Sequence, residues 1–320
     1  MRVVFTGTGE IGLPVLRWLI ESEVHELAGI VTQPDRPVGR DQRIQPPPIK
    51  AAVAGMGIPV FQPERIKRDE AVHEIQALAP DVIVVMAYGQ ILSRAVLEIP
   101  RLACLNLHAS LLPRHRGAAP IQAAIAAGDR ESGITVMYMN EGLDTGDILL
   151  KSEVQIAADE TGGSLHDRLA QIAPRALEEA LDLLSSGRAQ RVQQDNTRAT
   201  YAPKLERDHG VISWPESAEV IERKIRAFNP WPGAYTLLRD ATGRERKLKI
   251  FRARLALGRG TAAGALLVSH DAELLVGTGD GALLLTDLQL EGKKRMPASD
   301  LLRGNAWLAN AVVVTAAPDE

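Results

Sequence analysis

Short, continuous apolar runs alternate with amphipathic segments over the first part of the chain. Runs that are apolar at every position indicate strands buried on both faces, which is typical of a parallel sheet covered by helices. The pattern therefore predicts a doubly wound α/β domain over residues 1–188. The expected strands are 3–6, 27–31, 81–86, 102–106, 134–139 and 148–150, and the expected helices are 13–21, 91–97 and 165–184.

The pattern changes after residue 188. Residues 189–206 are polar and have no strong period, which is typical of a linker between domains. Gly and Asp then separate short strand-like runs, as in a small β-barrel or sandwich. We expect a second domain over 207–311 and a tail over 312–320. Its expected elements are a helix at 218–227 and strands at 247–251, 264–268, 273–276 and 282–289.

Composition narrows the class of protein. The chain has 320 residues, with 45% hydrophobic and 24% charged, as in ordinary soluble proteins. Its N-terminus runs straight into a strand without a charged leader, and no apolar run approaches the roughly 20 residues that span a bilayer. The single cysteine, Cys104, excludes an internal disulfide and a cysteine-based zinc site. We expect a cytoplasmic monomer that contacts no membrane and holds no metal.

A glycine fingerprint follows the first strand. Gly7, Gly9 and Gly12 fit the G-x-G-x-x-G spacing of dinucleotide-binding proteins, which makes a dehydrogenase one hypothesis. In dinucleotide-binding proteins, a carboxylate at the end of the second strand binds the ribose. The second strand of this chain has no carboxylate at its end, and Asp35 comes only later, after a proline. We therefore favour the alternative that these glycines permit a tight strand-to-helix turn.

Asn106 and His108 lie two residues apart at the end of an apolar run, so a strand places both on one face. An amide donor beside an imidazole suits acyl transfer, since one group can stabilise an oxyanion and the other can move protons. Asp144, between Gly142 and Gly146, is a carboxylate that could orient the imidazole. All three residues could instead be simple turn formers.

Residues 33–48 form a long segment with three arginines, Arg36, Arg40 and Arg43, and five prolines. Loops of this length in compact domains are usually functional or mobile, and its basic groups suit phosphates. A solvated surface loop is the alternative. The net charge of −3 does not indicate a general nucleic-acid binder, but a slight excess of basic residues in the C-terminal part permits a polyanionic partner.

Six segments carry a resemblance that covers nearly the whole chain. They are Thr32–Pro37, Ala87–Gly89, Asn106–Pro113, Arg116–Gln122, Gly142–Asp147 and Ala227–Pro232. With them the chain resembles the methionyl-tRNA formyltransferases, which belong to the formyltransferases that use 10-formyltetrahydrofolate. The pattern Asn-x-His-x-Ser-Leu-Leu-Pro with a later Asp is specific to folate formyltransferases. Phe-Asn-Pro-Trp-Pro and Gly292-Lys293-Lys294 indicate the tRNA-acting branch less exclusively.

This resemblance implies a Rossmann-like N-terminal domain that binds the folate and a C-terminal barrel of the oligonucleotide-binding type that binds tRNA. The implied reaction moves the formyl group of 10-formyltetrahydrofolate to the amino group of methionyl-initiator tRNA, for translation initiation. The family's catalytic trio corresponds here to Asn106, His108 and Asp144. Our hypothesis is that Asn106 and protonated His108 stabilise the oxyanion, while Asp144 keeps His108 charged. The other implied contacts are Tyr88, Ser110, Leu111, Leu112 and Pro113 with folate, and Arg36, Arg40 and Arg43 with tRNA, Arg40 being at the position of the family's important arginine.

The chain departs from the family pattern in two places. Asp41 and Gln42 stand where the family often has Gly and Lys, which removes a positive charge from the tRNA loop. Thr8-Gly9-Glu10 replaces the common Thr-Pro-Asp or Thr-Pro-Glu and so creates the dinucleotide-like spacing. The alternatives are a sugar-nucleotide amine formyltransferase, a folate-releasing hydrolase and a non-catalytic tRNA- or folate-binding module.

Overall fold

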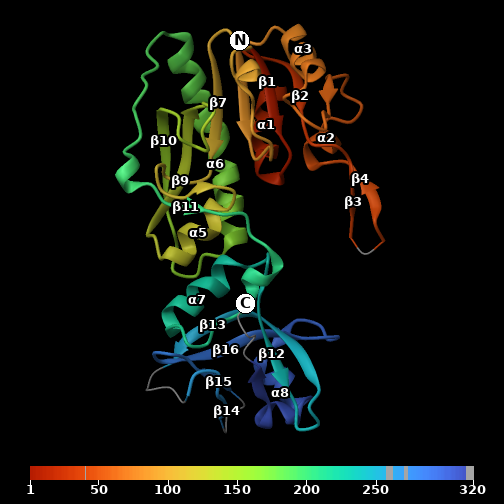
Figure 1. Cartoon of the computed structure of the whole chain (residues 1–320), viewed down its shortest axis with the longest axis vertical. Helices are drawn as coiled ribbons and strands as arrows, with labels where there is room; N and C mark the ends of the chain where they lie inside the picture. Colours follow the sequence, from red (N-terminus) through yellow and green to blue (C-terminus); the bar gives the residue numbers. More distant parts are fainter. Residues whose placement is uncertain (40, 257–261, 270–272, 315–320) are drawn as a thin grey trace. The chain divides into compact units, whose positions relative to one another are not determined.

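The computed structural model describes residues 1–39, 41–256, 262–269 and 273–314 (Figure 1). Two compact units make up the chain. The first comprises Met1–Pro120, Glu131–Gln155 and His166–Ala202. The second comprises Ile121–Arg130, Ile156–Leu165 and Pro203–Glu320.

A seven-stranded sheet forms the centre of the first unit, in the order β10-β9-β7-β6-β1-β2-β5. Strand order reverses between β1 and β6, the kind of switch point at which open α/β sheets bind ligands. β9 pairs antiparallel to β7 and β10 antiparallel to β9, so the predicted parallel sheet is correct for the other five strands only. β9 is almost wholly buried, and an apolar run does not encode strand direction. The bounds are β1 Arg2–Gly7, β2 Glu26–Val31, β5 Val60–Phe61, β6 Val82–Met86, β7 Ala103–His108, β9 Glu131–Tyr138 and β10 Ile148–Gln155.

Both faces of this sheet are buried. Val4, Ile83 and Val85 pack on one face with residues of α3 and α4, while Phe5 and Val84, which alternate with them, are buried on the other. The predicted doubly wound arrangement is therefore confirmed. The helices of this unit are α1 Leu13–Glu21, α2 Pro48–Ala52, α3 Asp69–Ala77, α4 Arg94–Leu97 and most of α6 Gly162–Ser185, whereas α5 Pro120–Ala127 belongs almost wholly to the second unit.

The second unit is built on an antiparallel sheet in the order β14-β15-β16-β13-β12-β18, with β17 paired to β16. A Cβ placed on Gly264, just before β14, would lie 3.5 Å from Cβ of Val313 in β18, so the two edges of the sheet approach each other. This nearly closed barrel confirms the predicted architecture. Its elements are α7 Ala218–Ala227, β12 Ala234–Arg239, β13 Glu245–Ala256, β14 Leu266–Val268, β15 Leu274–Gly277, β16 Ala282–Leu290, β17 Met296–Pro297, α8 Ala298–Arg303 and β18 Val312–Val314.

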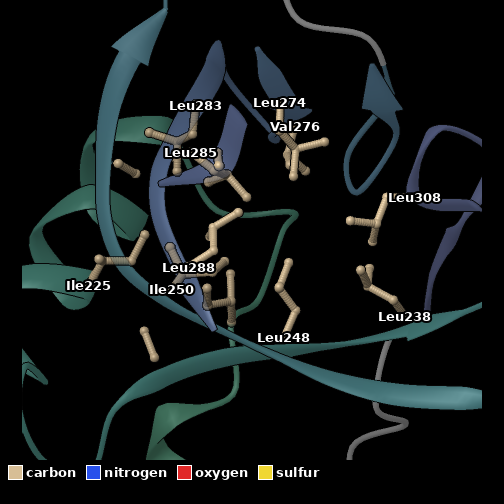
Figure 2. Packing of buried hydrophobic residues seen from close by; sticks show 14 of the residues in the cluster. Ile225, Leu238, Leu248, Ile250, Leu274, Val276, Leu283, Leu285, Leu288 and Leu308 are labelled. Atoms are coloured by element: carbon tan, nitrogen blue, oxygen red, sulfur yellow. The ribbon is translucent and has the colours of Figure 1, made fainter. Parts of the chain in front are cut away.

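Aliphatic side chains fill the barrel (Figure 2). Leu248 and Ile250 of β13 point inward beside Leu288 of β16, and Ile225 of α7 adds to the same cluster. Each such side chain contributes on the order of 1.5–3 kcal/mol when it leaves water. The inward positions of β13 therefore build the core, and the alternate positions, such as Lys247 and Lys249, face outward.

Two segments predicted to be irregular contain strands. Residues 33–48 include the antiparallel hairpin β3 Arg36–Val38 and β4 Arg43–Gln45, and Figure 1 shows this hairpin projecting from the body of the first unit. Within 189–206, β11 Tyr201–Ala202 pairs with β8 Arg116–Gly117. Among the described helices, none combines the length and apolar character needed to cross a bilayer.

Candidate active site

Asn106 and His108 project from the end of β7 on the same face as Cys104, because side chains alternate along a strand. His108 lies opposite Thr135 of β9 and is 6% exposed. Burial raises the pKa of the Cys104 thiol to about 12, so this cysteine stays protonated and is no nucleophile at neutral pH.

Asp144 reaches the same point from the loop between β9 and β10. Its Oδ1 accepts a hydrogen bond from Asn106 Nδ2 at 3.2 Å, and its Oδ2 accepts one from the backbone N–H of Gly117 at 2.9 Å. The same Oδ2 lies 3.6 Å from His108 Nδ1. The structure thus brings together the three residues that the sequence singled out.

His108 lies between two acceptors. Its Nε2 donates to the carbonyl oxygen of His115 at 2.9 Å, since a carbonyl can only accept, and Nδ1 faces the Asp144 carboxylate. Burial lowers the pKa of His108, while the Asp144 carboxylate and the bond to the His115 carbonyl oppose that shift. The free protein therefore favours neutral imidazole, whereas our hypothesis from the sequence has His108 protonated.

The segment expected to contact folate follows β7. Ser110 Oγ donates to the carbonyl of Arg114 at 2.6 Å, and Leu112 is fully buried beside Met137. Leu111 and Pro113 are half-buried. Within this segment, these two side chains have the surface to contact a ligand, while Ser110 and Leu112 hold the turn in place.

Tyr88 differs from the expectation in how it is placed. Its side chain is 2% exposed and packs in the core cluster with Val85 and Leu92. Burial raises its pKa to about 12, and its hydroxyl has no hydrogen-bond partner among the described residues. The Tyr88 carbonyl accepts from Thr8 Oγ1 at 2.9 Å and Gln33 Nε2 at 3.2 Å. The Tyr88 ring is therefore enclosed by the core under the loop that follows β6, and neither face of the ring is exposed to a ligand.

The arginines of the β3–β4 hairpin differ in their contacts. Arg36 Nη2 donates to Gln33 Oε1 at 3.2 Å, which joins the hairpin to the sheet. The side chain of Arg43 is 80% exposed. Its Nε lies 3.9 Å from Oδ2 of Asp41, a residue at which the chain departs from the family pattern. Arg40 lies outside the described residues. In the described part of the chain, neither Arg36 nor Arg43 is brought to the trio by a contact.

Two residues of the site were missed from the sequence. Gln194, in the segment expected to be a linker, donates to the carbonyls of Asp144 and Gly146, and Arg116 donates to its side-chain oxygen. Neither has a sequence signal beyond the position of Arg116 in a family segment, because their partners lie about 50 to 80 residues away in the chain.

The glycine fingerprint has a packing explanation. A Cβ on Gly7 would lie 2.8 Å from both the Met86 carbonyl oxygen and the ring of Phe5, and one on Gly12 would lie 3.0 Å from the same ring. Close contact between β1 and the turn that follows thus requires small residues. The described residues contain no group of three or more His, Cys, Asp or Glu side chains suited to a metal ion.

Comparison with known proteins shows to which family the chain belongs. Residues 1–181 match the family described as formyl transferase, and residues 204–306 match its C-terminal domain. A methionyl-tRNA formyltransferase of Citrifermentans bemidjiense is 47% identical over 95% of this chain and 93% of its own length. One of Pseudomonas entomophila is 50% identical over 94% of this chain and 95% of its own.

The fold also matches a solved structure, an N-formyltransferase from Helicobacter canadensis in complex with folinic acid and dTDP-3-aminofucose. Its TM-score is 0.63 at 15% identity, with 89% of this chain and 98% of that chain covered. This likeness concerns the fold alone, whereas the relatives above match in sequence almost from end to end. The chain belongs to the formyl transferase family and, within it, to the methionyl-tRNA formyltransferases.

Proposed function

We propose that the protein transfers the formyl group of 10-formyltetrahydrofolate to the α-amino group of methionyl-initiator tRNA. The observation that carries this proposal is the meeting of Asn106, His108 and Asp144 at the end of β7, in a chain of this family. The amine attacks the formyl carbon, the bond from that carbon to N10 of the folate breaks, and tetrahydrofolate leaves. One proton must pass from the amine to N10.

Asn106 is suited to stabilise the oxyanion of the tetrahedral intermediate. One hydrogen bond from its Nδ2, to Asp144, is found among the described contacts, and Nδ2 carries two hydrogens. The second can face the formyl oxygen. Because Asp144 fixes the amide, the donor is oriented before charge develops, which is the condition for effective electrostatic catalysis.

His108 is suited to move the proton. Neutral imidazole accepts it from the attacking amine, and the resulting imidazolium, beside the Asp144 carboxylate, donates it to N10. His108 Nε2 is bonded to the His115 carbonyl in this structure. In the neutral ring that this bond implies, Nε2 carries the proton and Nδ1 has the free lone pair. For Nε2 to accept the proton of the amine, this hydrogen bond must open and the ring proton must be on Nδ1, where it faces the Asp144 carboxylate.

Leu111 and Pro113 supply the apolar surface on which the folate would lie. Both belong to a turn tied to β9 through Thr135, whose Oγ1 donates to the Ser110 carbonyl at 2.6 Å and accepts from Leu112 N–H at 3.1 Å. A wall fixed in this way positions the formyl donor relative to His108, two residues before the turn.

Two basic surfaces support tRNA as the acceptor. One is the β3–β4 hairpin with Arg36 and Arg43, between which Arg40 lies in the sequence. The other is the outer face of the barrel, where Lys247 lies 3.8 Å from the ring centroid of Tyr235 and Arg295 lies 4.3 Å from that of Phe251. Cations interleaved with aromatic rings suit a phosphate backbone and its bases.

The direct test offers 10-formyltetrahydrofolate with either methionyl-initiator tRNA or an amino-sugar nucleotide. We expect formylmethionine after deacylation of the tRNA and no formylated sugar. Formylation of the sugar nucleotide alone would replace this proposal with the sugar-acting function. A monomer in the cytoplasm, where initiator tRNA is used, is part of the same proposal, and sedimentation of the purified protein tests the monomer.

A further inference from the structure

The segment between α6 and the second unit contains a buried polar side chain aimed at the active site. Gln194 is 6% exposed, although it lies in a polar stretch that the sequence identifies as a linker. Backbone hydrogen bonds in both directions between Val192 and Ile148, at 2.8 and 2.9 Å, place this stretch beside the start of β10. Gln194 therefore lies against the loop that carries Asp144.

Every polar group of the Gln194 side chain is used. Its Nε2 donates to the carbonyl oxygen of Asp144 at 2.9 Å and to that of Gly146 at 2.7 Å. Its Oε1 accepts from Arg116 Nε at 3.1 Å and Nη2 at 2.8 Å. Turning the amide over would set an oxygen against two carbonyls and an NH₂ group against a guanidinium, so these partners determine its orientation.

The loop that Gln194 binds needs support. Asp144 has φ of +51°, a left-handed conformation that costs a non-glycine residue energy and persists only where its surroundings enforce it. Gly146 lies so close to the Tyr138 carbonyl that a Cβ would be 1.7 Å from it. The two carbonyls that Gln194 binds therefore belong to the strained residue and to this tightly packed neighbour.

Arg116 and the residue after it contact both Gln194 and Asp144. Its side chain holds Gln194, and the next residue, Gly117, donates its backbone N–H to the Asp144 carboxylate at 2.9 Å. The two-residue strand β8 thus holds Asp144 in two ways. Gly117 binds the carboxylate directly, and Arg116 holds the backbone carbonyl through Gln194. Displacement of Gln194 would release the backbone of Asp144, so that this strained residue could relax and move its carboxylate away from Asn106 and His108.

We propose that Gln194 is a positioning residue for formyl transfer, which holds the backbone of Asp144 so that its carboxylate stays against Asn106 and His108. The inference rests on the proposed function for its kinetic consequences. Gln194 itself takes no part in bond making or proton transfer.

Three variants test the inference. Gln194→Ala removes all four contacts. Gln194→Glu keeps an acceptor for Arg116 but loses both donors to the loop, so it separates a role toward Asp144 from a role toward Arg116. Asn196→Ala is the matched control, because Asn196 accepts from Arg116 Nη2 at 2.8 Å in the same segment. No contact from its side chain to residues 144–146 occurs among the described hydrogen bonds.

We expect both Gln194 variants to lose at least about tenfold in kcat, since small displacements of a reacting group are costly. KM for folate and for tRNA should stay within about twofold of wild type, because neither substrate is proposed to touch Gln194. Asn196→Ala should keep the wild-type kcat.

The second readout is the titration of His108 by NMR in protein labelled at histidine. Among the described residues, the charged and titratable groups that act on His108 are Asp144 and His115. Loss of the pKa-raising effect of Asp144 should move the His108 titration to lower pH in both Gln194 variants and not in Asn196→Ala. Wild-type kcat together with an unmoved His108 titration in Gln194→Glu would overturn the inference.

The readouts separate the two proposals. If the wild-type protein does not formylate methionyl-tRNA but the His108 titration moves as expected, the proposed function fails and the positioning role stands. Should a Gln194 variant fail to fold by circular dichroism, Arg116→Lys, which keeps the glutamine but weakens its paired donors, is expected to reduce kcat in the same direction. An unchanged kcat in that variant would then contradict the inference.

Discussion

At the scale of single residues, His108 lies between opposing influences. Burial disfavours its charged form, whereas the Asp144 carboxylate and the His115 carbonyl favour it. In the free protein the effect of burial is the larger, so the pKa of His108 is lowered. A group that begins neutral and becomes charged beside a carboxylate is suited to carry a proton from the amine to the folate nitrogen.

This state of His108 also affects stability. Because burial lowers its pKa from the ordinary 6.5, the unfolded chain binds more protons than the folded protein as the pH falls below that value. The free energy of unfolding therefore falls on acidification through this range. We expect His108→Gln to lose less stability than wild type between about pH 6.5 and 5, as thermal unfolding would measure.

The exposed His73 on α3 provides the control. Thermal unfolding of His73→Gln over the same pH range measures the effect of losing a histidine away from the site. Parallel curves for His108→Gln and wild type would contradict the lowered pKa of His108.

Asn106 gives the second prediction at this scale. Removal of one oxyanion donor costs about 10²- to 10³-fold in kcat. Asn106→Ala should show a loss of this size by initial-rate measurement, with a thermal unfolding midpoint close to that of wild type. Turnover within about tenfold of wild type would remove Asn106 from the oxyanion role.

At the scale of elements, the β3–β4 hairpin is exposed along both strands. Arg43 and Asp41 form a long, solvent-exposed pair at 3.9 Å, which contributes little to stability. Their charges therefore act mainly on whatever approaches the hairpin. In this chain Asp41 opposes the attraction of Arg43 for a polyanion.

The hairpin prediction uses these two charges as a matched pair. Arg43→Ala should raise KM for tRNA and reduce the slope of log binding constant against log salt by about 1, while Asp41→Asn should lower KM for tRNA. KM for folate should stay unchanged in both variants. Equal effects on folate and tRNA would show that the hairpin does not act on tRNA.

Elements with a strong local pattern were predictable from the sequence. The helices at 13–21 and 218–227 match α1 and α7 residue for residue, because each combines amphipathic spacing with a clear start signal: Pro14 in the first turn of α1 and the Ser217 cap of α7. The direction of β9 and the structure within 189–206 were not predictable. Both depend on partners distant in sequence, such as Arg116 for Gln194.

The same reasoning applies to the site. Asn106 and His108 were singled out because strand alternation places both on one face, and Asp144 because it lies between two glycines in a loop from which a carboxylate can reach the imidazole. Tyr88 was expected beside the folate, but an aromatic residue after a buried strand can equally pack into the core. Whether such a ring packs into the core or faces a ligand depends on tertiary contacts, which the local sequence pattern does not determine.

At the scale of the whole molecule, chemistry and recognition are assigned to different parts of the chain. The trio lies in the first unit, and the outer face of the barrel, with Lys247 and Lys249 on β13, lies in the second. Lys249 and Arg43 share no partner among the described contacts. Their effects on tRNA binding should therefore be independent.

This independence is measurable with a double-mutant cycle. Lys249→Ala and Arg43→Ala should each weaken tRNA binding, and the free-energy changes should add to within about 0.5 kcal/mol in the double variant. Filter binding at constant salt gives the three values. A larger coupling energy would mean that the two residues contact the same part of the tRNA or influence each other.

The central claim is that the trio moves a formyl group from folate to an amine carried by tRNA. The most direct measurement follows a labelled formyl group in a single turnover with wild type and Asp144→Asn, in the presence of methionyl-initiator tRNA. The account predicts label in formylmethionine with wild type and a loss of about 10²-fold or more in rate with Asp144→Asn. Label recovered as free formate, or transfer at an equal rate by both proteins, would contradict it.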